Sequence, residues 1–200
     1  MRRMVLATTC VASLVALAGG NAGVTAGQRD AVLVGRVAAG GRPAPDVVVW
    51  LDAPGAAREP RTRVLEQRNM QFTPRVMAVQ VGSTVELPNN DRVFHNVFSF
   101  NHGKRFDLGL YPTGATKRIT LDRPAVNRLY CNIHPHMAAY IVAVDSPYYA
   151  TSDDAGSFAI RDVPAGRYTY HAWRSGGTML TATVTVGDGA PAAPMEVMWQ

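Results

Sequence analysis

Four residues able to bind a soft metal ion lie at two places in this chain. Three of them belong to the segment 131–137, which has the spacing Cys-x-x-His-x-x-Met and so carries a thiol, an imidazole and a thioether. The fourth, His95, lies in an alternating segment of β type. Two imidazoles, one thiolate and a weak axial thioether form the ligand set of blue-copper electron-transfer sites. The residues therefore predict one type 1 copper ion bound by His95, Cys131, His134 and Met137.

Two alternatives stay open for the same residues. Zinc also binds cysteine and histidine, although the thioether of Met137 favours copper, because soft sulfur ligands select it. The other alternative is a metal-free β-sandwich, in which His95 and His134 are core or turn residues and Met137 only fills space. A binuclear copper centre would need a second cysteine on the loop, and the loop has none.

Residues 1–26 have the features of a secretory signal peptide. A basic start precedes the apolar stretch from Val5 to Ala18, and Val24-Thr25-Ala26 provides small residues for cleavage. The stretch is too short to span a bilayer comfortably, so no membrane anchor is expected. Cleavage would remove Cys10 and leave Cys131 as the only cysteine of a periplasmic protein. Metal binding would explain a lone thiol in an oxidising compartment.

The charge pattern says little about partners. The formal net charge is +5, and the basic side chains are scattered, with no run and no interleaved aromatic residues. This distribution is typical of a solvated surface that slightly favours an acidic partner, and it argues against nucleic acid binding.

The chain is predicted to be all-β. No long window has helical periodicity, while short β-branched runs recur between glycine, proline and asparagine residues. The segment 53–63 is rich in Pro, Gly, Ala and Arg and is predicted to be a linker. Strands are predicted at 32–37, 46–51, 76–81, 84–87, 93–100, 118–121, 128–131, 139–144, 158–161, 167–173 and 181–186.

His95-Asn96-Val97 and the segment 131–137 together resemble the cupredoxin family of amicyanin and plastocyanin, with a loop spacing most similar to that of amicyanin. Phe72-Thr73-Pro74, the segment 81–85 and Asn89-Asn90-Asp91 resemble the approach to the first histidine in small blue-copper proteins. The resemblance covers about residues 65–145 and implies a Greek-key β-sandwich. It also implies that His95, Cys131 and His134 are equatorial ligands, that Met137 is axial, and that Asn96 ties the ligand loop to the strand.

The remaining histidines have less certain roles. His136 is expected to be an exposed bystander, although it could compete as a ligand or tune the site by protonation. His102 is expected at the surface, and His171, which alternates with aromatic neighbours, is expected to be structural.

A second module flanks this region. The segment 153–158, with the pattern D-x-x-G-x-F, and the segment 163–168, with P-x-G-x-Y, resemble transthyretin-like, carboxypeptidase-regulatory-like domains. Residues 30–55 and 146–187 are predicted to form one small β-sandwich, with a cupredoxin domain at 64–145 inserted in it and a tail at 188–200. The alternative is two units in series, with the opening strands completing the cupredoxin sheet. As a whole, the chain resembles periplasmic cupredoxin-like proteins labelled as methylamine-utilisation proteins.

These resemblances imply a one-electron carrier between periplasmic redox partners, such as c-type cytochromes or a dehydrogenase. His134 would lie near the surface, and Pro135, Ala138 and Ala139 would form an apolar docking patch. The alternatives are a copper storage or delivery protein and a non-redox structural module. No enzymatic activity is expected, because a closed four-ligand site leaves no position for a substrate.

Overall fold

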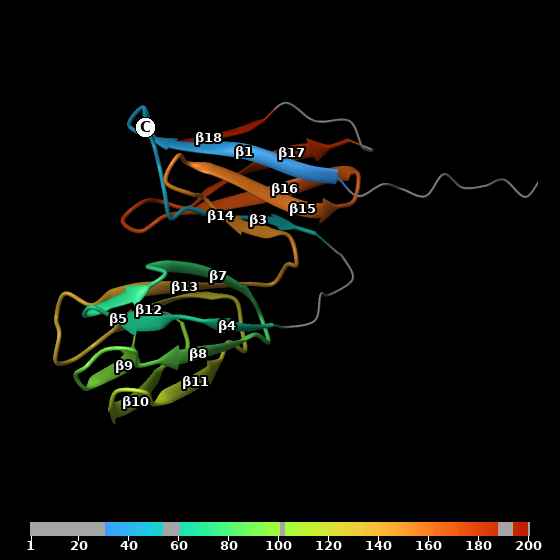
Figure 1. Cartoon of the computed structure of the whole chain (residues 1–200). Coiled ribbons are helices and arrows are strands. Elements are labelled where there is room, and N and C mark those ends of the chain that lie inside the picture. The colour runs from blue at the N-terminus through green and yellow to red at the C-terminus, as the bar shows by residue number, and fades with distance from the viewer. Residues whose placement is uncertain (1–30, 54–60, 101–102, 188–193, 200) are drawn as a thin grey trace, which may run out of the picture.

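The computed structural model describes residues 31–53, 61–100, 103–187 and 194–199. The predicted signal peptide and His102 lie outside these residues, as do parts of the predicted linker and tail. Every regular element among the described residues is a β-strand, which confirms the all-β prediction (Figure 1). This part of the chain contains no helix long and apolar enough to cross a membrane.

One group of strands comes from the beginning and the end of the described chain and forms two facing sheets. One sheet has the order β15-β1-β18, with β2 paired to β1, and the other has the order β14-β3-β16-β17. Buried side chains such as Leu33, Leu51 and Ile160 fill the space between them. The strands are β1 (Ala31–Ala39), β2 (Arg42–Pro43), β3 (Val48–Asp52), β14 (Tyr149–Thr151), β15 (Ser157–Val163), β16 (Gly166–Trp173), β17 (Leu180–Val186) and β18 (Met195–Trp199).

The strands between β3 and β14 in sequence form a second sandwich. Its larger sheet has the order β10-β9-β12-β13-β7, and its smaller sheet has the order β11-β8-β4. Leu87, Val97 and Leu129 belong to the core of this sandwich. The strands are β4 (Thr62–Val64), β5 (Glu66–Arg68), β6 (Gln71–Thr73), β7 (Val76–Gln80), β8 (Thr84–Pro88), β9 (His95–Ser99), β10 (Phe106–Tyr111), β11 (Thr116–Thr120), β12 (Ala125–Tyr130) and β13 (Ala138–Val144).

The two sandwiches pack through an apolar contact between β7 and β13 on one side and β3 on the other (Figure 1). Strands β7 and β13 are buried on both faces, because one face packs in the core of their own sandwich and the other lies in this contact. Nearly all of their residues are therefore apolar. The buried residues of the contact are Val48, Val76, Ala78, Val142 and Val144, flanked by Trp50 and Trp173.

The hairpin of β5 and β6 turns at Asn69 and Met70, which have positive φ angles of 53° and 54°. Two consecutive left-handed residues form a type I′ turn. Asparagine tolerates this conformation, whereas methionine rarely adopts it. The turn therefore needs support from outside the hairpin.

Strand β10 is not among the predicted strands, although Phe106, Leu108 and Leu110 alternate along it with Asp107 and Gly109. In the structure, Gly109 has a φ of 66°, and the register of β10 on β9 shifts between Asp107 and Leu110. The strand therefore contains an irregularity that a strict period of two cannot detect.

Candidate metal centre

The larger sheet of the second sandwich brings three of the four predicted ligands together, namely His95, Cys131 and His134. His95 is the first residue of β9, and Cys131 directly follows β12, which pairs with β9 through Tyr130 and Phe98. His134 lies in the short loop between β12 and β13. Adjacent strands thus place the distant His95 beside the loop that carries the other two ligands.

The three donor atoms form a compact triangle. His95 Nδ1 and His134 Nδ1 are 3.0 Å apart, and Cys131 Sγ lies 3.8 Å from the first and 3.6 Å from the second. A point equidistant from all three lies about 2.0 Å from each. Zinc, for comparison, bonds at about 2.0–2.1 Å to nitrogen and about 2.3 Å to sulfur. The three side chains therefore fit one first-row metal ion without rearrangement.

This triangle is largely shielded from solvent. His95 is 0% exposed and Cys131 is 3% exposed, whereas His134 is partly exposed at the edge of the site. Cys131 has no disulfide partner. The thiolate is the form of cysteine that binds metals, so the site offers two nitrogen donors and one soft sulfur donor.

His95 is oriented by Asp91 on the side opposite the triangle. His95 Nε2 lies 2.9 Å from Asp91 Oδ2. An ionised carboxylate can only accept, so Nε2 carries the proton and the lone pair of Nδ1 faces the other ligands. Carboxylates in this position fix the tautomer of a metal-binding histidine and raise its basicity.

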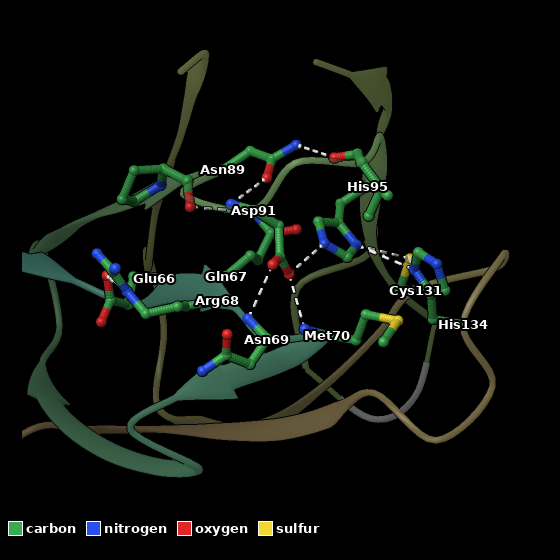
Figure 2. A network of polar contacts seen from close by, with 12 residues as sticks. Glu66, Gln67, Arg68, Asn69, Met70, Asn89, Asp91, His95, Cys131 and His134 are labelled. Atoms are coloured by element: carbon green, nitrogen blue, oxygen red, sulfur yellow. Dashed lines mark hydrogen bonds and ion pairs between the residues drawn. The ribbon is translucent and has the colours of Figure 1, made fainter. Parts of the chain in front are cut away.

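The same carboxylate supports the strained hairpin turn (Figure 2). Asp91 Oδ1 accepts from the backbone N–H of Asn69 at 2.9 Å, and Oδ2 accepts from that of Met70 at 2.7 Å. Desolvation raises the pKa of Asp91, but the hydrogen bonds from Met70, His95 and Asn69 outweigh it and hold this pKa below its usual value. Asp91 therefore links the β5–β6 turn to His95, one of the predicted ligands.

Asn96 connects the ligand loop to β9. Its Oδ1 accepts from the backbone N–H of Asn132, the residue after Cys131, at 3.2 Å. Its Nδ2 donates to Asp107 Oδ1 at 2.7 Å. Asn96 itself is 1% exposed, whereas Asn132 and Asp107 are exposed. The two contacts restrain the backbone next to the sulfur from the buried side.

The loop residues after Cys131 differ in environment. Burial, followed by the charges of His95 and His136, lowers the pKa of His134 and favours the neutral imidazole, the form that binds metals. Met137 N–H donates to the carbonyl of His134 at 2.9 Å, which closes the loop as a turn. The Met137 side chain is buried in the same apolar cluster as Cys131. His136 is exposed, with its ring centroid 6.3 Å from that of His134.

Tyr111, Gln67 and the Leu87 carbonyl form a buried polar network that the sequence analysis did not predict. Tyr111 pairs with His95 across β10 and β9, and its hydroxyl donates to the carbonyl of Leu87 at 3.0 Å and accepts from Gln67 Nε2. Burial raises the pKa of Tyr111 to about 12. Gln67 Oε1 is buried without a hydrogen-bond partner. No sequence spacing predicts that these residues are in contact, because they are distant in the chain and meet only through the packing of the sheets.

The surface near His134 differs from the predicted docking patch. Pro135 is exposed and Ala138 is half-buried. Ala139 is fully buried and pairs with Leu129, so its assignment to a docking surface was wrong. The pattern failed there because Ala139 begins the inward-facing alternation of β13.

Other apolar side chains next to the ligands are exposed. Phe94 precedes His95 and is 56% exposed, and Ile133 precedes His134 and is 46% exposed. Met70 is also exposed, and Figure 2 shows its side chain pointing toward the side of the site where His134 lies. We call Met70, Phe94, Ile133 and Pro135 the apolar rim.

His171 lies apart from the ligands, on β16. Its Nε2 is 2.8 Å from Asp52 Oδ2, its Nδ1 is 3.0 Å from Thr181 Oγ1, and its ring stacks on Trp50. These contacts are those of a structural histidine.

Comparisons with solved structures returned copper proteins, each matching less than half of this chain. A purple cupredoxin from Nitrosopumilus maritimus is 22% identical, with a match that covers 41% of this chain and 99% of that chain at a TM-score of 0.38. A mutant of amicyanin, in its reduced Cu(I) form, is 19% identical, with 48% and 98% covered and a TM-score of 0.38. A copper-containing nitrite reductase from Thermus scotoductus is 24% identical, with 48% of this chain but only 25% of that chain covered, at a TM-score of 0.41.

A family model described as domain II of polysaccharide lyase family 4 matches residues 141–193. The match covers a minority of the chain and does not place the chain in that family. It also differs from the transthyretin-like resemblance, which stays a prediction. A comparison with curated proteins returned no match.

Proposed function

We propose that this chain is a type 1 copper protein that carries single electrons between redox partners in the periplasm. The observation that carries the proposal is the buried triangle of His95 Nδ1, His134 Nδ1 and Cys131 Sγ, whose sides fit one metal ion. Met137, buried in the same cluster, would be the axial ligand. The chemistry of this donor set favours copper over zinc.

Copper bound here would supply a one-electron couple, and the protein would supply a rigid and dry environment. Asp91 fixes the orientation of His95, and Asn96 restrains the loop beside Cys131. Because both contacts are independent of the metal, the ligand positions are held before it binds. Ligands that stay in place need little rearrangement when the charge of the metal changes, which suits fast electron transfer.

The partly exposed His134 is the proposed route for electrons, and the apolar rim is the proposed contact for partners. We propose that these are c-type cytochromes or a dehydrogenase. Weak and transient redox encounters use small interfaces, and exposed apolar side chains beside the electron route can form one without long-lived binding. No catalytic activity is proposed, because a four-ligand site offers no open position for a substrate.

Copper storage or delivery is the alternative. It requires ligands that exchange readily, whereas His95 and Cys131 are buried. The burial of two ligands therefore supports a carrier over a storage protein.

The first experiment is a titration of the purified protein with Cu(II), followed by visible absorption and electron paramagnetic resonance. We expect an intense thiolate-to-copper band and narrow copper hyperfine splitting at one equivalent, both absent in Cys131→Ala. A weak spectrum that does not change in Cys131→Ala would contradict the copper assignment.

A second experiment tests the carrier role. The rate of electron transfer from the reduced protein to a c-type cytochrome is expected to fall in Ile133→Asp, because a charge in the apolar rim opposes docking. The matched control is Met198→Asp, since Met198 is 64% exposed on the other sandwich. Equal rates for the two variants would argue against docking at the rim.

A further inference from the structure

A hollow of about 440 Å³ lies in the cleft between the two sandwiches, away from the metal ligands. Its second-sandwich wall comes from the segment around β4 and from the end of β7, and its other wall comes from β14 and β15. Three arginines line it. The arginines are Arg61, Arg63 and Arg161, and Tyr149 also lines the hollow.

The fold explains why the three arginines meet. Arg61 and Arg63 are two positions apart on the extended segment that forms β4, so they project to the same face. Arg161 lies on β15, two positions after Ala159, which also lines the hollow. These residues are distant in sequence, and the packing of one sandwich against the other brings them together.

The side chains that line the hollow include arginines and no acidic residue. Among the described residues, no ion pair involves Arg61 or Arg63. Cations gathered at one place repel one another, and an anion between them removes this cost. Guanidinium groups hold carboxylate and phosphate oxygens through paired hydrogen bonds.

A second hollow of about 600 Å³ continues from the first and shares Arg63 and Tyr149 with it. Its lining also includes Asp46, Asp153 and Asp154, whose carboxylates can accept hydrogen bonds from hydroxyl groups. Sites for small organic ligands typically have volumes of about 300–1,000 Å³, so each hollow is larger than an inorganic oxyanion needs.

We propose that this cleft binds a small polyhydroxylated organic anion. Its phosphate or carboxylate group lies among Arg61, Arg63 and Arg161, and its hydroxyl-bearing body extends toward Asp153 and Asp154. Because both sandwiches line the cleft, the ligand also links them. The site is independent of the metal ligands.

Isothermal titration of the full protein, with and without copper, tests this proposal. The probes are a hexose phosphate, gluconate and inorganic phosphate. We expect saturable binding of one organic anion per chain, with preference for phosphate or carboxylate decided by the first two probes. Binding is expected to persist in Cys131→Ala, so failure of the copper assignment would leave this result unaffected.

The variant Arg63→Gln is expected to bind at least about tenfold more weakly, because it loses charge-assisted hydrogen bonds. Arg167→Gln is the matched control, since Arg167 is an exposed arginine on β16 whose guanidinium donates to Thr183 Oγ1 at 3.5 Å and which does not line either hollow. Equal weakening in both variants would overturn the site, as would the absence of saturation. Inorganic phosphate that binds as tightly as the hexose phosphate would overturn the role of the organic body.

Discussion

Removal of the Asp91 carboxylate tests whether one group both supports a hairpin turn and prepares a metal ligand. Asp91→Ala removes three hydrogen bonds, from the backbone of Asn69, from the backbone of Met70 and from His95 Nε2. The two left-handed residues of the turn then lose their support, and the His95 ring loses the partner that fixes its proton on Nε2.

Two separate effects are expected. Loss of a carboxylate that orients a metal-binding histidine lowers metal affinity about 10- to 100-fold, or about 1.4–2.7 kcal/mol. The loss of the three hydrogen bonds should lower the unfolding free energy of the metal-free protein by about 2–3 kcal/mol in total. The loss is no larger because the Asp91 side chain is 14% exposed, so water can replace part of these contacts. For a chain of this size that loss lowers Tm by about 4–12 °C.

The assays are competitive Cu(II) titration for affinity and calorimetry of the metal-free protein for Tm. Glu66→Gln is the matched control, because Glu66 belongs to the same surface network, accepts from Asn90 Nδ2 at 2.7 Å and touches no ligand (Figure 2). It should leave metal affinity unchanged. A lower Tm with native metal affinity in Asp91→Ala would refute the link between Asp91 and His95 and leave Asp91 as a support for the turn alone.

Two further changes have definite expectations. Asn96→Ala leaves the Asn132 N–H without its partner and should cost about 1–3 kcal/mol of unfolding free energy, and a broadened copper resonance signal would report the loosened loop. Tyr111→Phe tests the pH dependence of stability. Because the pKa of folded Tyr111 is about 12, above the ordinary value of about 10, the stability from its neutral form is complete below pH 10 and is lost as the pH rises toward 12. Urea unfolding at increasing pH should show a shallower loss in Tyr111→Phe, and an equal loss in both proteins would contradict the assignment.

The local part of the candidate site could be predicted from the sequence, because Cys131 and His134 lie within one short loop. Residues this close in the chain can reach a common point in almost any turn. Met137 as the axial ligand stays a prediction. The choice of His95 from among the other histidines rested on the resemblance to a known family. In the structure, the pairing of β9 with β12 supplies the physical reason for that choice.

The supporting residues could not be assigned from the sequence in the same way. The resemblance places Asp91 only in the approach to the first histidine, and nothing in the spacing connects it with Asn69 and Met70. Ala139 is expected at the surface because it directly follows the ligand loop in the sequence, yet the alternation of β13 turns it inward.

The all-β class and the spacing of the loop donors follow from the sequence alone, because strand periodicity and ligand spacing are properties of neighbouring residues. The residues that hold His95 in place and the arginines that share the cleft between the sandwiches become neighbours only in the folded protein. Those contacts depend on strand order, on sheet register and on the packing of two cores. A change of one residue in register would turn each side chain to the opposite face of its sheet.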